Sequence, residues 1–179
     1  EVVKKLTQEL NIVNSFTKEV LNKIEKNKKN KDSLLYITSE AYRNADNYLM
    51  QNERNDISIL VLAGGWIESM YILTQTSQNA ESPEVINRIG QQKYALDNLI
   101  ELMRPYYNAK SKDYDELLQD LSDLALIFDG VTEHYEYKTP ETLREEKLTI
   151  INSENRIEIN EYQLKNISES IAKIRQGII

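Results

Sequence analysis

Residues 57–73 read ISILVLAGGWIESMYIL, and they form the longest apolar run in the chain. Small and polar residues interrupt the run, so it falls short of the ~20 apolar residues of a membrane span. Asn55 and Asp56 precede it and are favourable residues for capping the N-terminus of a helix. Because the segment from Asn55 to about Ser77 is apolar on nearly every side, the sequence predicts that it is the central and most buried helix.

The segments around this run show the same helical signature. Their apolar residues recur every three or four positions, which places them on one face of each helix. Ser82 followed by Pro83 marks a helix start, and Thr139-Pro140-Glu141 predicts a further short helical turn in the same way. The predicted helices cover residues 2–26, 33–53, 55–77, 82–103, 111–134 and 161–177.

A different period appears before the last helix. Leu148 and Ile150 alternate with polar residues, as do Ile157 and Ile159, and turn-forming residues 152–155 lie between them. This alternation predicts a small β-hairpin at about 147–159, and an isolated hairpin is marginally stable, so it must pack on the bundle or on a partner. The predicted fold is therefore mainly α: a single-domain helical bundle of about six helices over residues 1–179, with the hairpin before a final helix at about 161–177.

The composition fits such a bundle and excludes several kinds of chemistry. Hydrophobic residues make up 40% and charged residues 28%, with only five glycines and three prolines. These values are typical of a globular helical domain. The chain has no cysteine, which excludes disulfides, thiol catalysis and cysteine-bound zinc.

The charge argues against nucleic-acid binding. The net charge is −7 and the sequence pI about 4.9, so the chain repels phosphate as a whole. Lysines dominate the first thirty-odd residues, whereas the stretch from Asp113 to Glu146 is strongly acidic. Such runs usually form solvated faces. The alternative is a basic N-terminal arm that lies near a membrane or an acidic partner.

Two adjacent glycines inside a helix cost about 1 kcal/mol each relative to alanine, so Gly64 and Gly65 need a local reason. One reason is the close approach of another helix or a bulky ring. The alternative is a shallow notch for a small ligand, flanked by Trp66 and Tyr71. Glu68 lies four residues after Gly64 on the same helix face, and in so apolar a helix it needs an Arg, Lys or Tyr hydroxyl as its partner. These five residues are the candidate ligand-binding residues.

The sequence assigns no catalytic residue, no metal site and no cofactor. His134 is the only histidine, so a histidine-rich metal site is excluded, and it is predicted near the end of the helix over 111–134. No P-loop, dinucleotide-binding motif, zinc-protease motif or calcium-binding loop occurs. The eleven tyrosines are interpreted as residues at the boundary between core and solvent, with an apolar ring and a solvated hydroxyl. The alternative is that they form a contact surface for a sugar or a protein.

The segment Gly64-Gly65-Trp66-Ile67-Glu68 resembles a motif of an uncharacterised, exported, lipoprotein-like family of helical proteins from Bacteroidetes-type bacteria. The C-terminal arrangement is also similar: a short hairpin, then residues 159–164 opening a final helix. The resemblance covers most of the chain from the second predicted helix onward, and its motifs are short. It implies a periplasmic or outer-membrane-associated location, with a signal or lipid anchor upstream that would tether the domain to a membrane. It implies no activity and no functional residue.

These observations favour a non-enzymatic helical domain of the cell envelope that binds a protein partner or a small ligand. The first alternative is a carboxylate-based enzyme with Glu68 as acid or base, which requires a second charged group beside Glu68 in a cleft. The second alternative is a truncated helical sensor domain, which requires a transmembrane helix and a signalling domain next to this segment.

Overall fold

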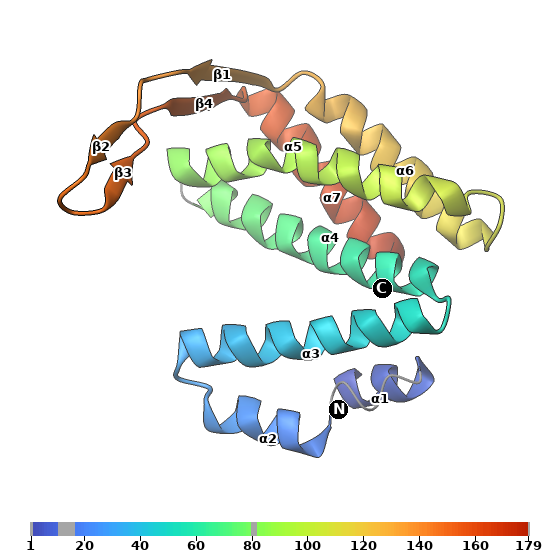
Figure 1. Ribbon diagram of the computed structural model, residues 1–179. Coiled ribbons are helices and arrows are strands. Elements are labelled where there is room, and N and C mark those ends of the chain that lie inside the picture. Colours follow the sequence, from blue (N-terminus) through green and yellow to red (C-terminus); the bar gives the residue numbers. More distant parts are fainter. Residues whose placement is uncertain (1, 11–16, 80–81, 179) are drawn as a thin grey trace. The chain divides into compact units, whose positions relative to one another are not determined.

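The computed structural model describes residues 2–10, 17–79 and 82–178 (Figure 1). The protein is mainly helical, with a small antiparallel β region before the last helix, and the predicted fold class is confirmed. Tertiary contacts divide the chain into two compact units, Glu1–Val61 and Leu62–Ile179. The prediction of a single domain over residues 1–179 stays a prediction, and each unit is described separately.

The first unit holds three helices and the beginning of a fourth: α1 (Val2–Glu9), α2 (Lys18–Lys26), α3 (Lys31–Gln51) and the first turns of α4 (Asn55–Asn79). The prediction of one helix over residues 2–26 is wrong. Thr17 has extended backbone angles, and its hydroxyl accepts a hydrogen bond from the backbone N–H of Val20, so a new helix begins there. Residues 11–16 of the predicted helix lie outside the described residues.

Helices α3 and α4 are joined by a short loop in which Glu53 has a positive φ of 58°. Ala45 and Leu49 of α3 form a small buried core, against which Leu10, Tyr48 and Ile57 pack. Arg54 donates a hydrogen bond to the carbonyl of Leu10 at 2.5 Å. This contact ties the loop to the end of α1, and the hydroxyl of Ser58 on α4 donates a hydrogen bond to the carboxylate of Asp46 on α3.

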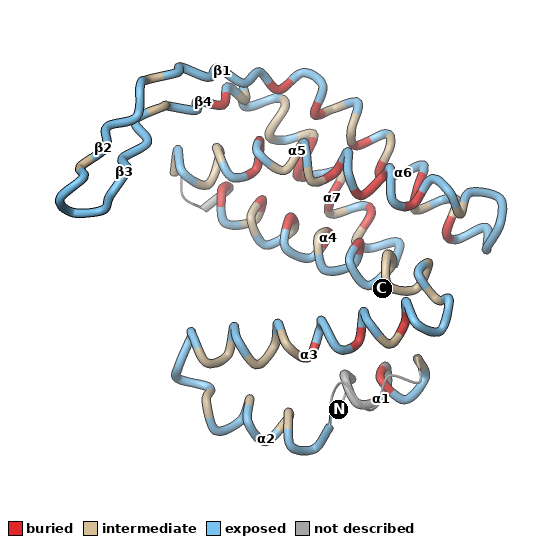
Figure 2. Tube along the Cα trace, viewed as in Figure 1, coloured by how far each residue is buried: buried red, intermediate tan, exposed pale blue. Residues whose placement is uncertain are grey.

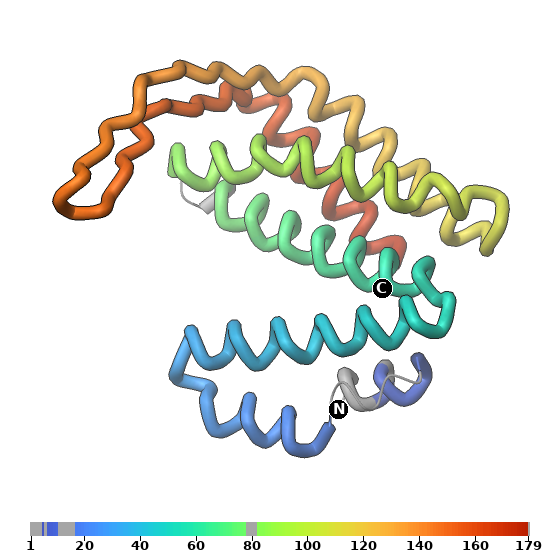
Figure 3. The backbone as a smooth tube through the Cα atoms, in the orientation of Figure 1, coloured from blue at the N-terminus to red at the C-terminus, as the bar shows by residue number. Residues whose placement is uncertain are grey.

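The second unit contains the rest of α4, then α5 (Pro83–Met103), a 3₁₀ turn η1 (Arg104–Tyr106), α6 (Lys112–Phe128), four short strands and α7 (Glu161–Ile178). Figure 3 shows the backbone running from α5 into α6, out through the strands and back into α7. The buried positions of these helices recur every three or four residues, as Figure 2 shows in red. The fully buried large side chains of this unit include Ile67, Met70, Ile89, Leu96, Met103, Leu121, Leu124, Phe128, Ile167 and Ile171.

Helix α4 is less buried than its sequence suggests. Its buried residues are Ala63, Ile67, Met70, Thr74 and Ser77, which lie on one face because they follow at intervals of three or four. Apolar side chains elsewhere on α4 are exposed; Leu62 and Ile72 expose 54% and 57% of their surface. The prediction that α4 is the most buried helix is therefore wrong, since an apolar composition does not by itself supply neighbours on every side.

Strand β1 (Thr132–Glu136) pairs with β4 (Glu154–Glu158), and β2 (Glu141–Leu143) pairs with β3 (Leu148–Ile150), both antiparallel. Two of these four strands, β3 and β4, lie within the predicted hairpin at about 147–159, but they do not pair with each other, and β1 and β2 were not predicted. The predicted partners, β3 and β4, are separated by residues 151–153 and belong to different sheets. Helix α6 ends at Phe128, so His134 lies on β1, and the predicted helical turn after Pro140 is strand β2.

The final helix is confirmed, and its start has a clear local cause. The side chain of Asn160 accepts a hydrogen bond from the backbone N–H of Gln163 at 2.8 Å. The side chain of Gln163 in turn accepts one from the backbone N–H of Asn160 at 2.9 Å. This reciprocal capping box satisfies two backbone donors at the beginning of α7.

Candidate functional site

The predicted ligand-binding residues lie on α4, and the structure places them on different sides of it. Gly64 and Gly65 are exposed, and a Cβ added to either would meet nothing within 4 Å. The predicted close helix crossing at these glycines is therefore wrong. Trp66 and Glu68 are two residues apart, which turns their side chains to nearly opposite sides of the helix. The five residues do not converge on one hollow, and a ligand site built from them stays a prediction.

Glu68 has the partner that the sequence requires. Its two carboxylate oxygens accept hydrogen bonds from Arg175 of α7, from Nε at 2.6 Å and from Nη2 at 3.3 Å. The Arg175 guanidinium also lies over the ring of Tyr71, 4.4 Å from its centroid. The hydrogen bond that Arg175 donates to Glu68 raises the pKa of Arg175. These contacts join α4 to α7 and give the carboxylate of Glu68 a positively charged partner.

Trp66 faces α5 instead. Its half-buried indole donates a hydrogen bond from Nε1 to the Oε1 atom of Gln92 at 3.2 Å. A buried tryptophan usually finds such a partner for its N–H group. Trp66 therefore joins α4 to α5, and together with Glu68 it gives the motif Gly64-Gly65-Trp66-Ile67-Glu68 an architectural role in the second unit.

Two open hollows lie between α2 and α3, in the first unit. One has a volume of about 420 Å³ and is lined by residues that include Lys23, Asp32 and Tyr36. A second of about 250 Å³ shares Lys23 and Tyr36 and extends to Glu40 and Asn44. The sequence analysis missed this region, because its residues carry no motif and come together only when α2 folds back along α3.

His134 lies on an exposed strand and not at a helix end. Its Nε2 atom lies 3.4 Å from a carboxylate oxygen of Glu158 on the neighbouring strand β4. Within the described ranges, no group of three or more histidine, aspartate or glutamate side chains could hold a metal ion. Both groups are exposed, so the contact is a surface ion pair when His134 is protonated.

Gly90 of α5 admits a close approach of another segment. A Cβ at this position would overlap the Cγ2 atom of Ile157 and would lie 3.1 Å from the Cδ1 atom of Ile159. Ile157 belongs to β4 and is buried. Because Gly90 has no side chain, Ile157 packs directly on α5 and holds the strand pair β1–β4 against this helix. The sequence analysis did not single out Gly90, although an isolated glycine after Ile89 in an apolar helix was a signal for it.

A polar cluster fixes the same strand pair to α5. The hydroxyl of Tyr94 and the side-chain amide of Asn155 both donate hydrogen bonds to the carboxylate of Glu133. These two hydrogen bonds lower the pKa of Glu133, and the contact with the carboxylate raises the pKa of Tyr94. All three groups are at the surface, so the cluster positions β1 and β4 and does not form an enclosed reaction site.

The hairpin β2–β3 carries an exposed apolar face. Its register places Leu143 opposite Leu148 and Glu141 opposite Ile150 on one face, and Thr142 opposite Thr149 on the other. Leu148 and Ile150 expose 47% and 37% of their surface. Figures 1 and 2 show the hairpin beyond the ends of the neighbouring helices, with most of its trace in the colour of exposed residues.

One helix in the described residues is long and apolar enough to cross a membrane by length and composition, so the expectation that this run falls short of a membrane span is not met. It covers Asn55–Ser77, with a hydropathy of 1.6, and 22% of this window is buried. This is weak evidence for a membrane span, because core helices and signal sequences have the same composition. The window also contains Glu68, whose carboxylate binds Arg175.

No protein-family model, no curated protein and no solved structure matches this chain.

Proposed function

We propose that this chain is a non-enzymatic helical domain of the cell envelope, and that its hairpin β2–β3 contacts a protein partner. The observation that carries the proposal is the apolar face of Leu143, Leu148 and Ile150 on a hairpin that projects from the helices. Two-stranded hairpins are marginally stable in water by themselves. Exposed strand edges also offer unpaired backbone groups to another chain. A partner that covers this face would remove both costs.

The carboxylate-based enzyme is less well supported. Glu68 is held by both oxygens on Arg175, and Trp66 points to the other side of α4. A general acid or base needs a perturbed carboxyl within reach of a substrate in a cleft. The cell-envelope location rests only on the resemblance of the motif at Gly64–Glu68 to an exported family. The sensor alternative is tested by the sequence that flanks this segment in the genome.

The proposal is tested with the double substitution Leu148→Ser and Ile150→Ser. The matched control is Leu126→Ser on α6, which removes an apolar side chain that is 70% exposed at a different place in the second unit. Tagged wild type, double variant and control are purified from envelope fractions of the native host after cross-linking. We expect a partner that the wild type and the control retain and the double variant loses.

The thermal midpoint of each protein completes the test. An unchanged midpoint in the double variant is expected if the face is free for a partner, because neither side chain belongs to the buried core. A large fall in the midpoint would instead make the face part of the folded core. Equal partner recovery from all three proteins would refute the assignment of the hairpin as the contact surface.

A further inference from the structure

The projecting β segment is two sheets in series, not one continuous ribbon. The inner sheet pairs β1 with β4, and the outer sheet pairs β2 with β3. Between them the strand ladder is interrupted at residues 137–140 on one side and 151–153 on the other. Pro140 lies in the first of these segments, and it has no backbone N–H to donate across the interruption. Pro140 therefore removes one backbone donor from the junction.

The two sheets differ in how they are attached to the helices. The inner sheet is fixed on α5 by Ile157 against Gly90 and by the hydrogen bond from Tyr94 to Glu133. In the outer hairpin, residues 141–150 are exposed except for the half-buried Leu143. The orientation of the outer hairpin therefore depends on the junction.

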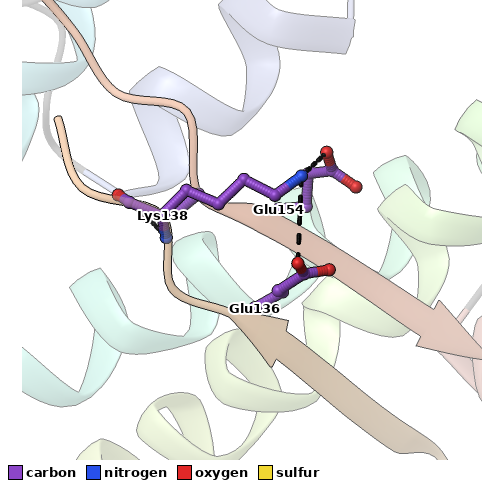
Figure 4. Close-up of polar contacts among 4 residues, drawn as sticks. Glu136, Lys138 and Glu154 are labelled. Carbon is purple, nitrogen blue, oxygen red and sulfur yellow. Dashed lines mark hydrogen bonds and ion pairs between the residues drawn. The ribbon is translucent and has the colours of Figure 1, made fainter. Parts of the chain in front are cut away.

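Lys138 and Ser153 make the polar contacts that close this junction. The backbone N–H of Lys138 donates to the hydroxyl of Ser153 at 3.2 Å, and that hydroxyl donates to the carbonyl of Lys138 at 3.3 Å. The ammonium of Lys138 reaches Glu154 at the start of β4 and lies 4.0 Å from Glu136 at the end of β1, as Figure 4 shows. Across the described junction segments, the side-chain hydrogen bonds and ion pairs all involve Lys138.

These contacts are weak enough to open. Both hydrogen bonds to Ser153 are long, and the ion pairs of Lys138 are exposed to solvent, where such pairs contribute little. The hydrogen bond from the ammonium of Lys138, together with its positive charge, lowers the pKa of Glu154. The junction has the features of a hinge. Few contacts resist rotation at the interruption of the ladder, and the inner and outer sheets on its two sides each keep their own strand pairing.

We infer that the outer hairpin β2–β3 is a hinged arm, and that Ser153 and Lys138 form the latch that holds it in one orientation. The hinge is a property of the isolated chain, so it goes beyond the proposed partner binding and does not depend on it. The latch sets the direction of the apolar face of Leu148 and Ile150. Opening it lets the hairpin turn while the inner sheet stays on α5.

The hinge is tested by measuring a distance distribution with paired spin labels. The chain has no cysteine, so labels can be placed at chosen sites without removing others. One label replaces Glu145 in the turn of the outer hairpin, and the other replaces the exposed Asn98 on α5. A second pair, at Thr132 and Asn98, reports on the inner sheet. The distributions are measured by pulsed electron resonance in the wild-type background and in Ser153→Ala.

We expect a narrow distribution for the outer pair in the wild type and a clearly broader one in Ser153→Ala, with the inner pair narrow in both. Ser122→Ala on α6 also removes a serine that hydrogen-bonds to a backbone carbonyl, and it should leave both distributions unchanged. Lys138→Met should broaden the outer pair more than Lys165→Met, which removes an exposed lysine–glutamate pair on α7. Equal distributions in wild type and Ser153→Ala, whether narrow or broad, would overturn the latch. Broadening of the inner pair would overturn the location of the hinge.

Discussion

Alanine substitutions at Gly64, Gly65 and Gly90 distinguish helix positions with free space around them from a position in close contact with another segment. Glycine in a helix interior is about 0.8–1 kcal/mol less favourable than alanine, mainly because it has more conformational freedom in the unfolded chain. At Gly64 and Gly65 an added Cβ meets nothing within 4 Å, so no packing term opposes this gain. We therefore expect each of Gly64→Ala and Gly65→Ala to stabilise the second unit by about 0.5–1 kcal/mol.

Gly90→Ala should behave differently. The new Cβ would overlap the Cγ2 atom of Ile157, which is a branch atom on a buried, β-branched side chain and cannot swing away freely. Overpacking a core position costs about 1–3 kcal/mol, and the helix gain of about 1 kcal/mol offsets part of it. The net expectation is a destabilisation of about 0–2 kcal/mol, which is about 1–3 kcal/mol away from the effect at Gly64.

Urea unfolding followed by tryptophan fluorescence measures these differences. Trp66 is the only tryptophan, and it lies in the same unit as all three glycines. The control is the double variant of Gly90→Ala with Ile157→Ala. The clashing atom is absent in this variant, so adding Gly90→Ala to Ile157→Ala should no longer lower the free energy of unfolding. If Gly90→Ala stabilised the protein as much as Gly64→Ala does, close packing of Ile157 on Gly90 would be refuted. Loss of stability in Gly64→Ala would show that the face is covered.

Three further measurements test separate contacts. Arg175→Met should lower the urea midpoint more than Lys165→Met does. Arg175 makes two hydrogen bonds to Glu68 and lies over the ring of Tyr71, whereas Lys165 makes one exposed ion pair. Equal midpoints would contradict the role of Arg175 in joining α4 to α7. Because the folded-state pKa of Glu133 lies below its usual 4.5, its stabilisation is present above about pH 4.5 and is lost as the pH falls through the lowered pKa. The thermal midpoint of Glu133→Gln should therefore fall less steeply below pH 4.5 than that of the wild type, and parallel profiles would count against the cluster. Thr17→Ala should destabilise α2 by about 1 kcal/mol, since it removes an N-cap; a gain in helicity by circular dichroism would favour one continuous helix instead.

Helices that bury one stripe of apolar residues could be predicted from the sequence. The starts of α5 and α7 were also local matters. Pro83 takes a first-turn position of α5, and Asn160 and Gln163 cap the start of α7 within three positions of each other. The pairing requirement of Glu68 followed from the cost of an unpaired carboxylate in an apolar helix, and Arg175 meets it. The sequence could not name Arg175, because the partner lies more than one hundred residues away.

The sequence by itself determined most of the helices, the change to a strand period before the last helix, and that Glu68 needs a partner, but it missed the helix start at Thr17 and the strands β1 and β2. These properties depend on neighbours within a few residues, so local patterns contain them. Only the tertiary structure decided which strands pair, why Gly90 is a close contact while Gly64 and Gly65 are open, and which side of α4 is buried. Each of these depends on atoms from distant segments, whose approach a periodic pattern permits but does not specify.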